Sequence, residues 1–378
     1  MNIKILCVEF ENLKHFKGGA FKIDFYATDR VFENSELYKI SKSVFAQNLI
    51  AFTGLNATGK TSVLRILKIA LNVIIGNIDL NSFETNAVIG EGTVMRVTFF
   101  CNDVYYNLES SIGIESARLI YREEILKKKK VSDIKTRRSL MNFDNAEIEK
   151  RSDLDVEIKK YLDDGKSFIS PVIKGNDSCV SDNLLLNYVN ISPTVGNIPS
   201  EIIEIFDENI ESLTVEDSKS SKWRLKFKNN DSVYSATDLL TLNLIVSTGT
   251  IRGQELIQRA VTTLVKGGYL IIDELEMHLN KEIIKVILEL FKSRQTNPNG
   301  ACLIFSTHYP ELLDLMSRKD NIYITRKKNT LLSVSKYSDE FKRNDFKKSD
   351  IILSNVLTGT APKYESIKRL RDYVCALF

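Results

Sequence analysis

A glycine-rich octapeptide constrains the fold of this chain more than any other feature of its sequence. Residues 54–61 read GLNATGKT and fit the pattern GxxxxGK[ST] at every fixed position. A short apolar run, Asn48–Thr53, precedes them, and apolar residues at helical spacing follow from Lys60 to about residue 75. In this context glycines let backbone amides curl around phosphate groups, and the helix N-terminus adds positive charge. The sequence therefore predicts a strand, a phosphate-binding loop and a helix.

The residues of this loop have distinct expected roles toward a bound nucleoside triphosphate. The Lys60 ammonium should lie between the β- and γ-phosphates, and the Thr61 hydroxyl is a hard oxygen ligand of the kind that Mg²⁺ prefers. An ordinary glycine-rich turn is the alternative, and it is disfavoured because strand, loop and helix follow in the required order. We expect ATP to contact Gly54, Asn56, Ala57, Thr58, Gly59, Lys60, Thr61 and Ser62, with Mg²⁺ held at Thr61.

Two later apolar runs also end in polar residues, as buried strands of an open α/β sheet do at a ligand site. Tyr269–Ile272 is followed by Asp273 and Glu274, and a run from Leu303 ends in His308. Asp273 is expected to hold Mg²⁺, and Glu274 to orient or deprotonate the attacking water. His308 should lie on a neighbouring strand and reach the γ-phosphate as a hydrogen-bond donor. The other two histidines, His15 and His278, are expected to be structural.

A fourth feature, VSTGT at residues 246–250, opens an amphipathic helix. Ser247 and Gly249 place a hydroxyl and free backbone amides at the helix N-terminus, which favours an anion. Plain capping by a serine or threonine is the alternative. The position of the segment, shortly before Asp273, favours the anion site.

These four features, in this order, resemble the ABC-type ATPase superfamily. The nearest branch is the RecF/SMC/OLD-like one, and the chain is similar to the short AAA-type ATP-binding proteins of Septu-like and PARIS-like antiphage systems. Three phrases carry the resemblance: VSTGTIRG is similar to LSxGxxR, IIDELEMHLN to IDEPExxLHP, and IFSTHYPELLD to FTTHSPELL. The likeness covers residues 1–110 and 235–320. It implies an α/β fold, an ABC-type P-loop ATPase head with a mixed sheet, helices on both faces and an inserted, partly helical arm.

The resemblance also implies how such a head works. ATP bound at Lys60 and Thr61 of one subunit would be capped by Ser247 and Gly249 of a second, giving a head-to-tail homodimer, alone or within a larger assembly, that slow hydrolysis opens. The sequence departs from the family in two places. Its glutamines are Gln47, Gln254, Gln258 and Gln295, so none occupies the usual glutamine loop between residues 61 and 246. Asn280-Lys281 stands where the family usually has His-Pro.

The chain of 378 residues divides by its patterns into four expected parts. These are an ATPase lobe with the phosphate loop (1–110), an inserted arm (111–235), a second ATPase lobe (236–341) and a basic tail (342–378). Within the arm we expect helices at 115–130 and 145–163, and a hairpin at 222–235 that returns to the main sheet. Strands alternating with helices predict that this sheet is largely parallel.

The overall charge excludes attraction to nucleic acid by the whole surface. Lysine and arginine number 52 against 49 acidic residues, a net charge of +3, so any basic surface must be local. The candidates are Lys127–Lys130 with Lys135, Arg137 and Arg138, and a tail cluster of Lys342, Arg343, Lys347 and Lys348. A solvated face is the favoured explanation of both clusters. Five scattered cysteines and the lack of a long apolar stretch predict a cytoplasmic protein with no membrane partner.

An ABC-type head is a switch, and the leading hypothesis makes it the ATPase and sensor subunit of a bacterial antiphage system. It would gate a separately encoded effector, such as a nuclease. The alternative is a RecF-like DNA repair and recombination clamp, with DNA as its partner, against which the modest net charge counts. A transporter energy module is disfavoured by the missing glutamine loop and the long segment between Lys60 and Ser247. An OLD-type enzyme with its own nuclease is disfavoured because too few residues follow His308.

Overall fold

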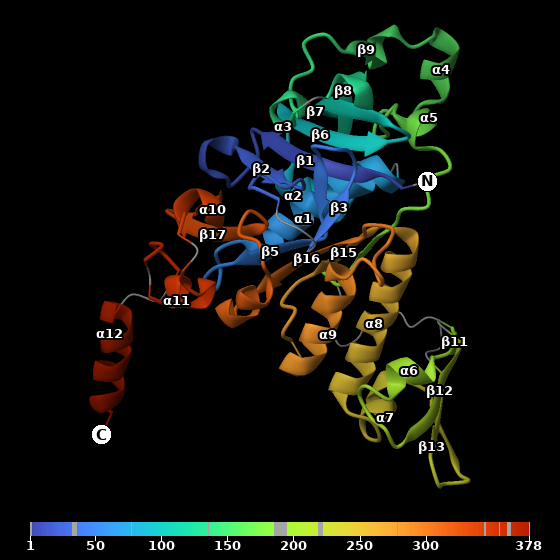
Figure 1. The fold of residues 1–378 in the computed structure, drawn as a ribbon, viewed down its shortest axis with the longest axis vertical. Helices are drawn as coiled ribbons and strands as arrows, with labels where there is room; N and C mark the ends of the chain where they lie inside the picture. The colour runs from blue at the N-terminus through green and yellow to red at the C-terminus, as the bar shows by residue number, and fades with distance from the viewer. Residues whose placement is uncertain are drawn as a thin grey trace.

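The computed structural model describes residues 2–31, 36–76, 78–134, 136–184, 195–217, 222–277, 279–343, 345–354, 356–360 and 364–377. Two six-stranded sheets dominate the fold, with helix α1 (Lys60–Leu71) between them (Figure 1). Among the described residues, no helix combines the length and the apolar character needed to cross a membrane.

The first sheet is antiparallel throughout, in the order β2-β1-β6-β7-β8-β9. Its strands are β1 (Lys4–Glu11), β2 (Phe21–Asp24), β6 (Thr93–Cys101), β7 (Val104–Glu115), β8 (Arg118–Lys130) and β9 (Glu147–Lys150). A short pair, β3 (Leu37–Lys39) and β4 (Phe45–Gln47), lies beside it.

The second sheet is largely parallel, as the alternation of strands and helices predicts, in the order β10-β15-β16-β5-β17-β18. Its strands are β5 (Leu49–Thr53), β10 (Val180–Asp182), β15 (Tyr269–Ile272), β16 (Cys302–Thr307), β17 (Ile322–Lys328) and β18 (Leu331–Lys336). Of the described strands of this sheet, only β18 runs antiparallel to its neighbour. Strands β5, β15 and β16 therefore end at the same edge, and this brings the phosphate loop, Asp273 and His308 together.

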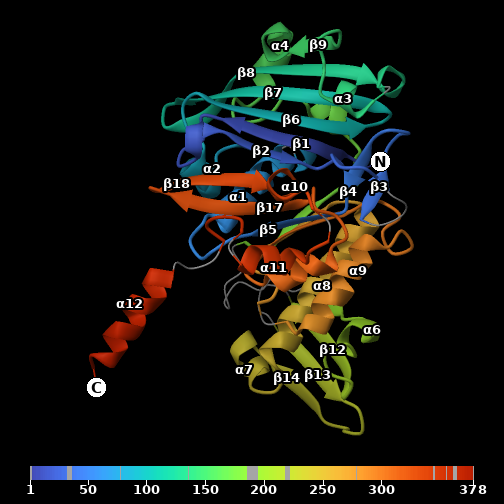
Figure 2. The same cartoon turned by 60° about the vertical axis from the view of Figure 1, so that its left-hand side comes forward.

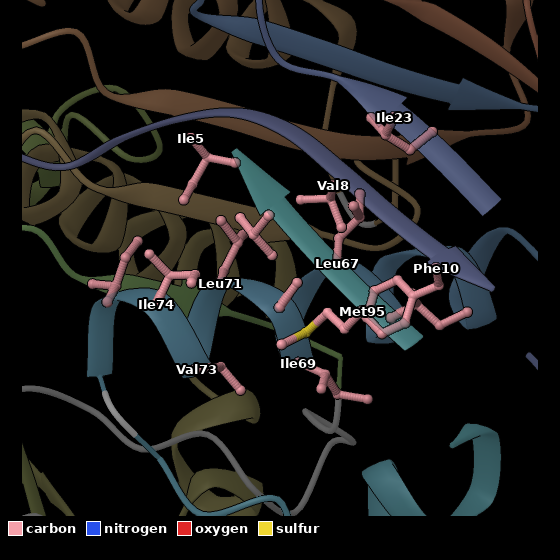
Figure 3. Packing of buried hydrophobic residues seen from close by; sticks show 14 of the residues in the cluster. Ile5, Val8, Phe10, Ile23, Leu67, Ile69, Leu71, Val73, Ile74 and Met95 are labelled. Carbon is pink, nitrogen blue, oxygen red and sulfur yellow. The ribbon is translucent and has the colours of Figure 1, made fainter. Parts of the chain in front are cut away.

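Successive residues of these parallel strands alternate between two cores. Ile50 and Phe52 face the core with α1, whereas Leu49 and Ala51 face the other core. On the first side α1, continued by a π-helical turn (Asn72–Gly76), packs against the apolar faces of β1 and β6 (Figure 3). On the second side lie α8 (Thr248–Lys266) and α9 (Lys281–Lys292). The fold class expected from the sequence, an α/β sheet with helices on both faces, is confirmed.

A small four-stranded sheet lies beyond the far end of α8 (Figures 1 and 2). Its strands are β11 (Gly196–Asn197), β12 (Ile210–Asp217), β13 (Lys222–Phe227) and β14 (Val233–Ala236), flanked by α6 (Ser200–Ile203) and α7 (Leu239–Asn243). The expected hairpin at 222–235 exists as β13 and β14, but the prediction that it returns to the main sheet is wrong, because both strands belong to the smaller sheet. Strand β13 pairs with β12 and β14 of the smaller sheet, and Trp223 and Leu225 are buried in the same core as α8.

The prediction of a helix at 115–130 is also wrong, since Arg118–Lys130 form strand β8. They pair with β7 along their length, and Leu119, Tyr121 and Leu126 fall on its buried side. A bulge opposite Ser111 and Ile112 interrupts the strict alternation that would have revealed a strand. Residues 145–163 form β9, a 3₁₀ turn (Arg151–Asp153) and the short helix α4 (Val156–Tyr161) instead of one helix. The expected arm thus contributes β8 and β9 to the first sheet and β10 to the second.

The basic run in β8 is partly used inside the chain. Lys128 pairs with Glu147 at 3.0 Å and Glu149 at 2.6 Å, and the Lys129 ammonium donates to the carbonyls of Ser139 and Asn142. Lys135 lies outside the described residues. In the tail, Lys348 donates to the Met316 carbonyl at 2.8 Å, and helix α12 (Tyr364–Cys375) stands away from the body (Figure 2).

Candidate nucleotide site

The phosphate-loop segment leads from the end of β5 into α1 and contains two glycines. At both positions a residue with a side chain would be strained. Gly54 has φ +154° and Gly59 has φ +90°. A Cβ on Gly54 would lie 2.5 Å from the Thr325 carbonyl oxygen, and one on Gly59 would lie 2.7 Å from the Leu332 side chain. The loop therefore has the open backbone that a phosphate-binding loop needs.

The Lys60 side chain is buried and curls back into this loop. Its ammonium donates to the carbonyls of Gly54 at 2.9 Å and Leu55 at 3.1 Å, and lies 3.3 Å from Nδ1 of His308. Burial lowers the pKa of Lys60, although the charges of Asp273, Glu274 and Glu276 act in the opposite direction. The ammonium is thus held at the loop mouth by acceptors that anionic oxygens can replace.

The Thr61 hydroxyl and the Asp273 carboxylate meet across the two strand ends. Thr61 Oγ1 donates to Asp273 Oδ2 at 2.5 Å. A hydroxyl and a single carboxylate are the protein ligands that Mg²⁺ uses when phosphates and waters complete its shell. The described residues hold no cluster of three or more His, Cys, Asp or Glu side chains fit for a metal. The Thr61–Asp273 pair fits Mg²⁺ carried by a nucleotide, because one hydroxyl and one carboxylate leave the rest of the shell to phosphates and waters.

Ser306, at the end of β16, links the two carboxylate residues. Its hydroxyl donates to Asp273 Oδ1 and accepts from the Glu274 backbone N–H at 2.8 Å. Glu274 itself has φ +51°, a conformation that is costly for a residue with a side chain. The backbone geometry at Glu274 is therefore imposed by its surroundings.

His308 contacts two acidic residues that follow β15, Glu274 and Glu276. Its Nε2 lies 3.3 Å from Glu274 Oε1, and its backbone N–H donates to Glu276 Oε1 at 2.6 Å. Because β16 pairs in parallel with β15, as expected, His308 and Glu274 leave neighbouring strands at the same edge. The structure thus brings Lys60, Thr61, Asp273, Glu274 and His308 into one site.

An open pocket of about 610 Å³ surrounds the phosphate loop. Besides the expected residues 56–62, Glu274 and His308, it is lined by His15 and by the β17–β18 turn with Lys327, Thr330 and Leu332. His15 was expected to be structural, and the other three residues were not expected at the site. The His15 carbonyl accepts from Leu332 N at 2.7 Å, so this contact between distant segments sets their place. His278 lies outside the described residues.

Ser247 and Gly249 are not part of this pocket. Ser247 is exposed and caps α8, its Oγ accepting from Thr250 N at 3.0 Å. Helix α8 starts beside α7, at the end remote from the parallel sheet (Figure 1). Within one chain, the segment expected to cap the nucleotide lies away from the phosphate loop.

Two further residues of the site were missed by the sequence analysis: Ser306 and Asn183. The Asn183 side chain accepts a hydrogen bond from the Asp273 backbone N–H at 2.7 Å and donates one to the Asp273 carbonyl at 3.4 Å. For Asn183 the only local signal is a carboxamide directly after Val180–Asp182, a three-residue strand in which two residues are polar, and this does not mark a strand end at a ligand site. Asn280, where the family usually has His, caps α9 by accepting from Ile283 N at 2.9 Å.

A family model described as "AAA domain, putative AbiEii toxin, Type IV TA system" matches residues 191–314. The fold is that of a P-loop ATPase. The matched segment includes Ser247, Asp273, Glu274 and His308, and the phosphate loop lies outside it. Among curated proteins, no sequence matches the chain significantly. A P-loop ATPase domain indicates nucleotide binding, typically with Mg²⁺, and the loop, Lys60 and the Thr61–Asp273 pair fit that ligand.

Proposed function

We propose that this chain is an ATP-dependent molecular switch of the ABC type. Mg²⁺-ATP binding at the phosphate loop closes a head-to-tail homodimer, and slow hydrolysis opens it. The observation that carries the proposal is the separation of two expected halves of one site. Lys60, Thr61, Asp273, Glu274 and His308 converge at the edge of the parallel sheet, whereas Ser247 is exposed at the remote end of α8. A second copy would supply the missing half.

In this proposal each residue has one task. Lys60 and the loop amides bind the phosphates, and Thr61 with Asp273 holds Mg²⁺, which neutralises phosphate charge when it is bound. Glu274 takes a proton from the attacking water, and His308 donates a hydrogen bond to the γ-phosphate. Ser247 and Gly249 of the second copy present a hydroxyl and helix amides to the same phosphate.

We further propose that the switch belongs to a bacterial antiphage system and gates a separately encoded effector. The words "putative AbiEii toxin, Type IV TA system" in the matching family description support a toxin–antitoxin setting. Two of the four consecutive lysines in β8 are already paired within the chain, which weakens the case for a DNA clamp.

The test is the light-scattering mass of Glu274→Gln protein with and without Mg²⁺-ATP, alone, with the protein encoded next to it, and with duplex DNA. We expect ATP to double the mass and the dimer to bind the neighbouring protein. Ser247→Arg should prevent the doubling. Thr262→Arg, on an exposed position of the same helix, should not. A dimer that binds DNA and does not bind the neighbouring protein would identify a DNA clamp. If the mass is the same with and without Mg²⁺-ATP, the ATP-dependent switch is excluded.

A further inference from the structure

The end of strand β10 lies directly beside Asp273. β10 is the edge strand next to β15, with Asp182 opposite Ile271, and the Asn183 N–H donates to the Ile271 carbonyl at 3.1 Å. The Asn183 side chain then accepts from the Asp273 N–H at 2.7 Å and donates to the Asp273 carbonyl at 3.4 Å. Its carboxamide thus stands in for the next peptide group of a longer strand and extends the parallel ladder by one residue.

These contacts hold the peptide group between Asp273 and Glu274 from two sides. Asn183 Nδ2 bonds to its carbonyl oxygen, and Ser306 Oγ accepts from its N–H at 2.8 Å. Beyond that N–H, Glu274 adopts its φ of +51°. Such a conformation persists only where the surroundings fix it. The orientation of this peptide determines the direction in which the Glu274 side chain leaves the backbone, toward His308.

The same strand end is tied to the two helices that carry the other parts of the site. Arg259 of α8 donates to the Asp182 carbonyl at 3.2 Å, and Lys68 of α1 pairs with the Asp182 carboxylate at 3.1 Å. Helix α1 begins with Lys60 and Thr61, and α8 begins next to Ser247. Asp182, the residue before Asn183, therefore couples the position of Asn183 to both helices.

We propose that Asn183 is a positioning residue for hydrolysis, holding the Asp273–Glu274 peptide so that the Glu274 carboxylate stays beside His308. The inference rests on the proposed ATPase function. Asn183 does not line the phosphate-loop pocket, and its side chain acts on the backbone of Asp273. Asn183 affects the rate of the chemical step, whereas the affinity for nucleotide depends on the phosphate loop.

The test compares Asn183→Ala with a matched control, Asn176→Ala. Asn176 also donates to two backbone carbonyls, those of Ile75 and Ile173, and lies away from the site. Since a small misplacement of a catalytic group lowers the rate steeply, Asn183→Ala should lower kcat by about 10- to 100-fold. Its Kd for Mg²⁺-ATP should change by less than about threefold, because no interaction with the nucleotide is removed. The control should keep both constants.

A kcat of Asn183→Ala equal to that of the unaltered protein would overturn the proposal. So would a parallel loss of kcat, affinity and thermal stability, which would assign Asn183 a general packing role. A second measurement is independent of hydrolysis: hydrogen exchange of the Asp273 and Glu274 amides in the nucleotide-free protein. Asn183→Ala should accelerate this exchange, and an unchanged exchange rate would refute the proposal that Asn183 holds the Asp273–Glu274 peptide. If the unaltered protein hydrolyses no ATP, the proposed function fails, and the exchange measurement still decides whether Asn183 holds this peptide.

Discussion

His308 and Glu274 face each other across the ends of two neighbouring strands, with Nε2 of the imidazole 3.3 Å from Oε1 of the carboxylate. The other ring nitrogen, Nδ1, lies 3.3 Å from the Lys60 ammonium. The ring therefore connects the residue expected to activate water with the residue expected to hold the phosphates. Both contacts are at the long end of hydrogen-bond range, as is common where a site tightens around its ligand.

We predict that His308→Ala lowers the rate of ATP hydrolysis by about 100-fold or more and leaves ATP binding nearly intact, because a positioned proton donor acts mainly on the transition state. Steady-state phosphate release and equilibrium titration with a fluorescent ATP analogue measure the two effects. Tyr309→Ala, an exposed neighbour on the same segment, serves as the control. Equal losses in rate and affinity would show that His308 binds the ground state instead.

The affinity for ATP should fall with rising pH earlier than an ordinary lysine would predict. Burial lowers the pKa of Lys60 below 10.5, and the phosphates bind its protonated form. At pH values below the lowered pKa the ammonium is fully present and affinity is constant. Above it, affinity falls with each pH unit until the pKa of the bound state is reached. Calorimetric titration between about pH 7 and 10 measures this fall. Lys60→Arg, which stays charged, should show no such fall.

Gly59→Ala should destabilise the fold by about 1–3 kcal/mol and weaken ATP binding, because φ +90° and the Leu332 side chain both oppose a Cβ. Gly92→Ala separates the two causes. Gly92 has φ +77° and nothing within 4 Å of its hypothetical Cβ, so it carries the backbone strain alone. Urea unfolding gives both free energies. If the two variants lose the same stability, contact with Leu332 contributes nothing.

Lys4→Met should destabilise the protein by about 3 kcal/mol, since it leaves buried acceptors without a donor. The Lys4 ammonium donates to the carbonyls of Gly267 at 3.0 Å, Asn299 at 2.5 Å and Gly300 at 2.7 Å. It thereby ties β1 to the end of α8 and to the turn before β16. Lys22→Met, which removes a half-exposed lysine paired with Glu9 on the same sheet, should cost less than about 1 kcal/mol. Comparable losses would contradict a special role for Lys4.

The central part of the site could be predicted from the sequence because its signals are local. The phosphate loop depends on eight consecutive residues, and Asp273 and His308 each end an apolar run. Parallel strands share an edge, so these ends had to meet once the strands were recognised. The same logic predicts that β15 and β16 are neighbours, which the register confirms.

The missed residues depend on contacts between segments far apart in sequence. Asn183 acts only because β10 is placed beside β15, and Ser306 only because its hydroxyl faces Asp273. His15 reaches the pocket through a backbone contact with Leu332. Strand β8 was taken for a helix because the bulge opposite Ser111 and Ile112 puts Leu126 out of the alternation that Leu119 and Tyr121 begin. In each case the pairing partner, which the local sequence does not contain, determines the outcome.

The strand order of the parallel sheet has a consequence for the synthesis of the protein. β5, which leads into the phosphate loop, is flanked by β16 and β17, and both come from the last part of the chain. A chain emerging from the ribosome N-terminus first carries this apolar strand unpaired along both edges for most of translation. Pairings of such large sequence separation form slowly. The segment that defines the chemistry of the protein is thus made early and completed last, and a nascent chain that stops before β17 has no finished nucleotide site.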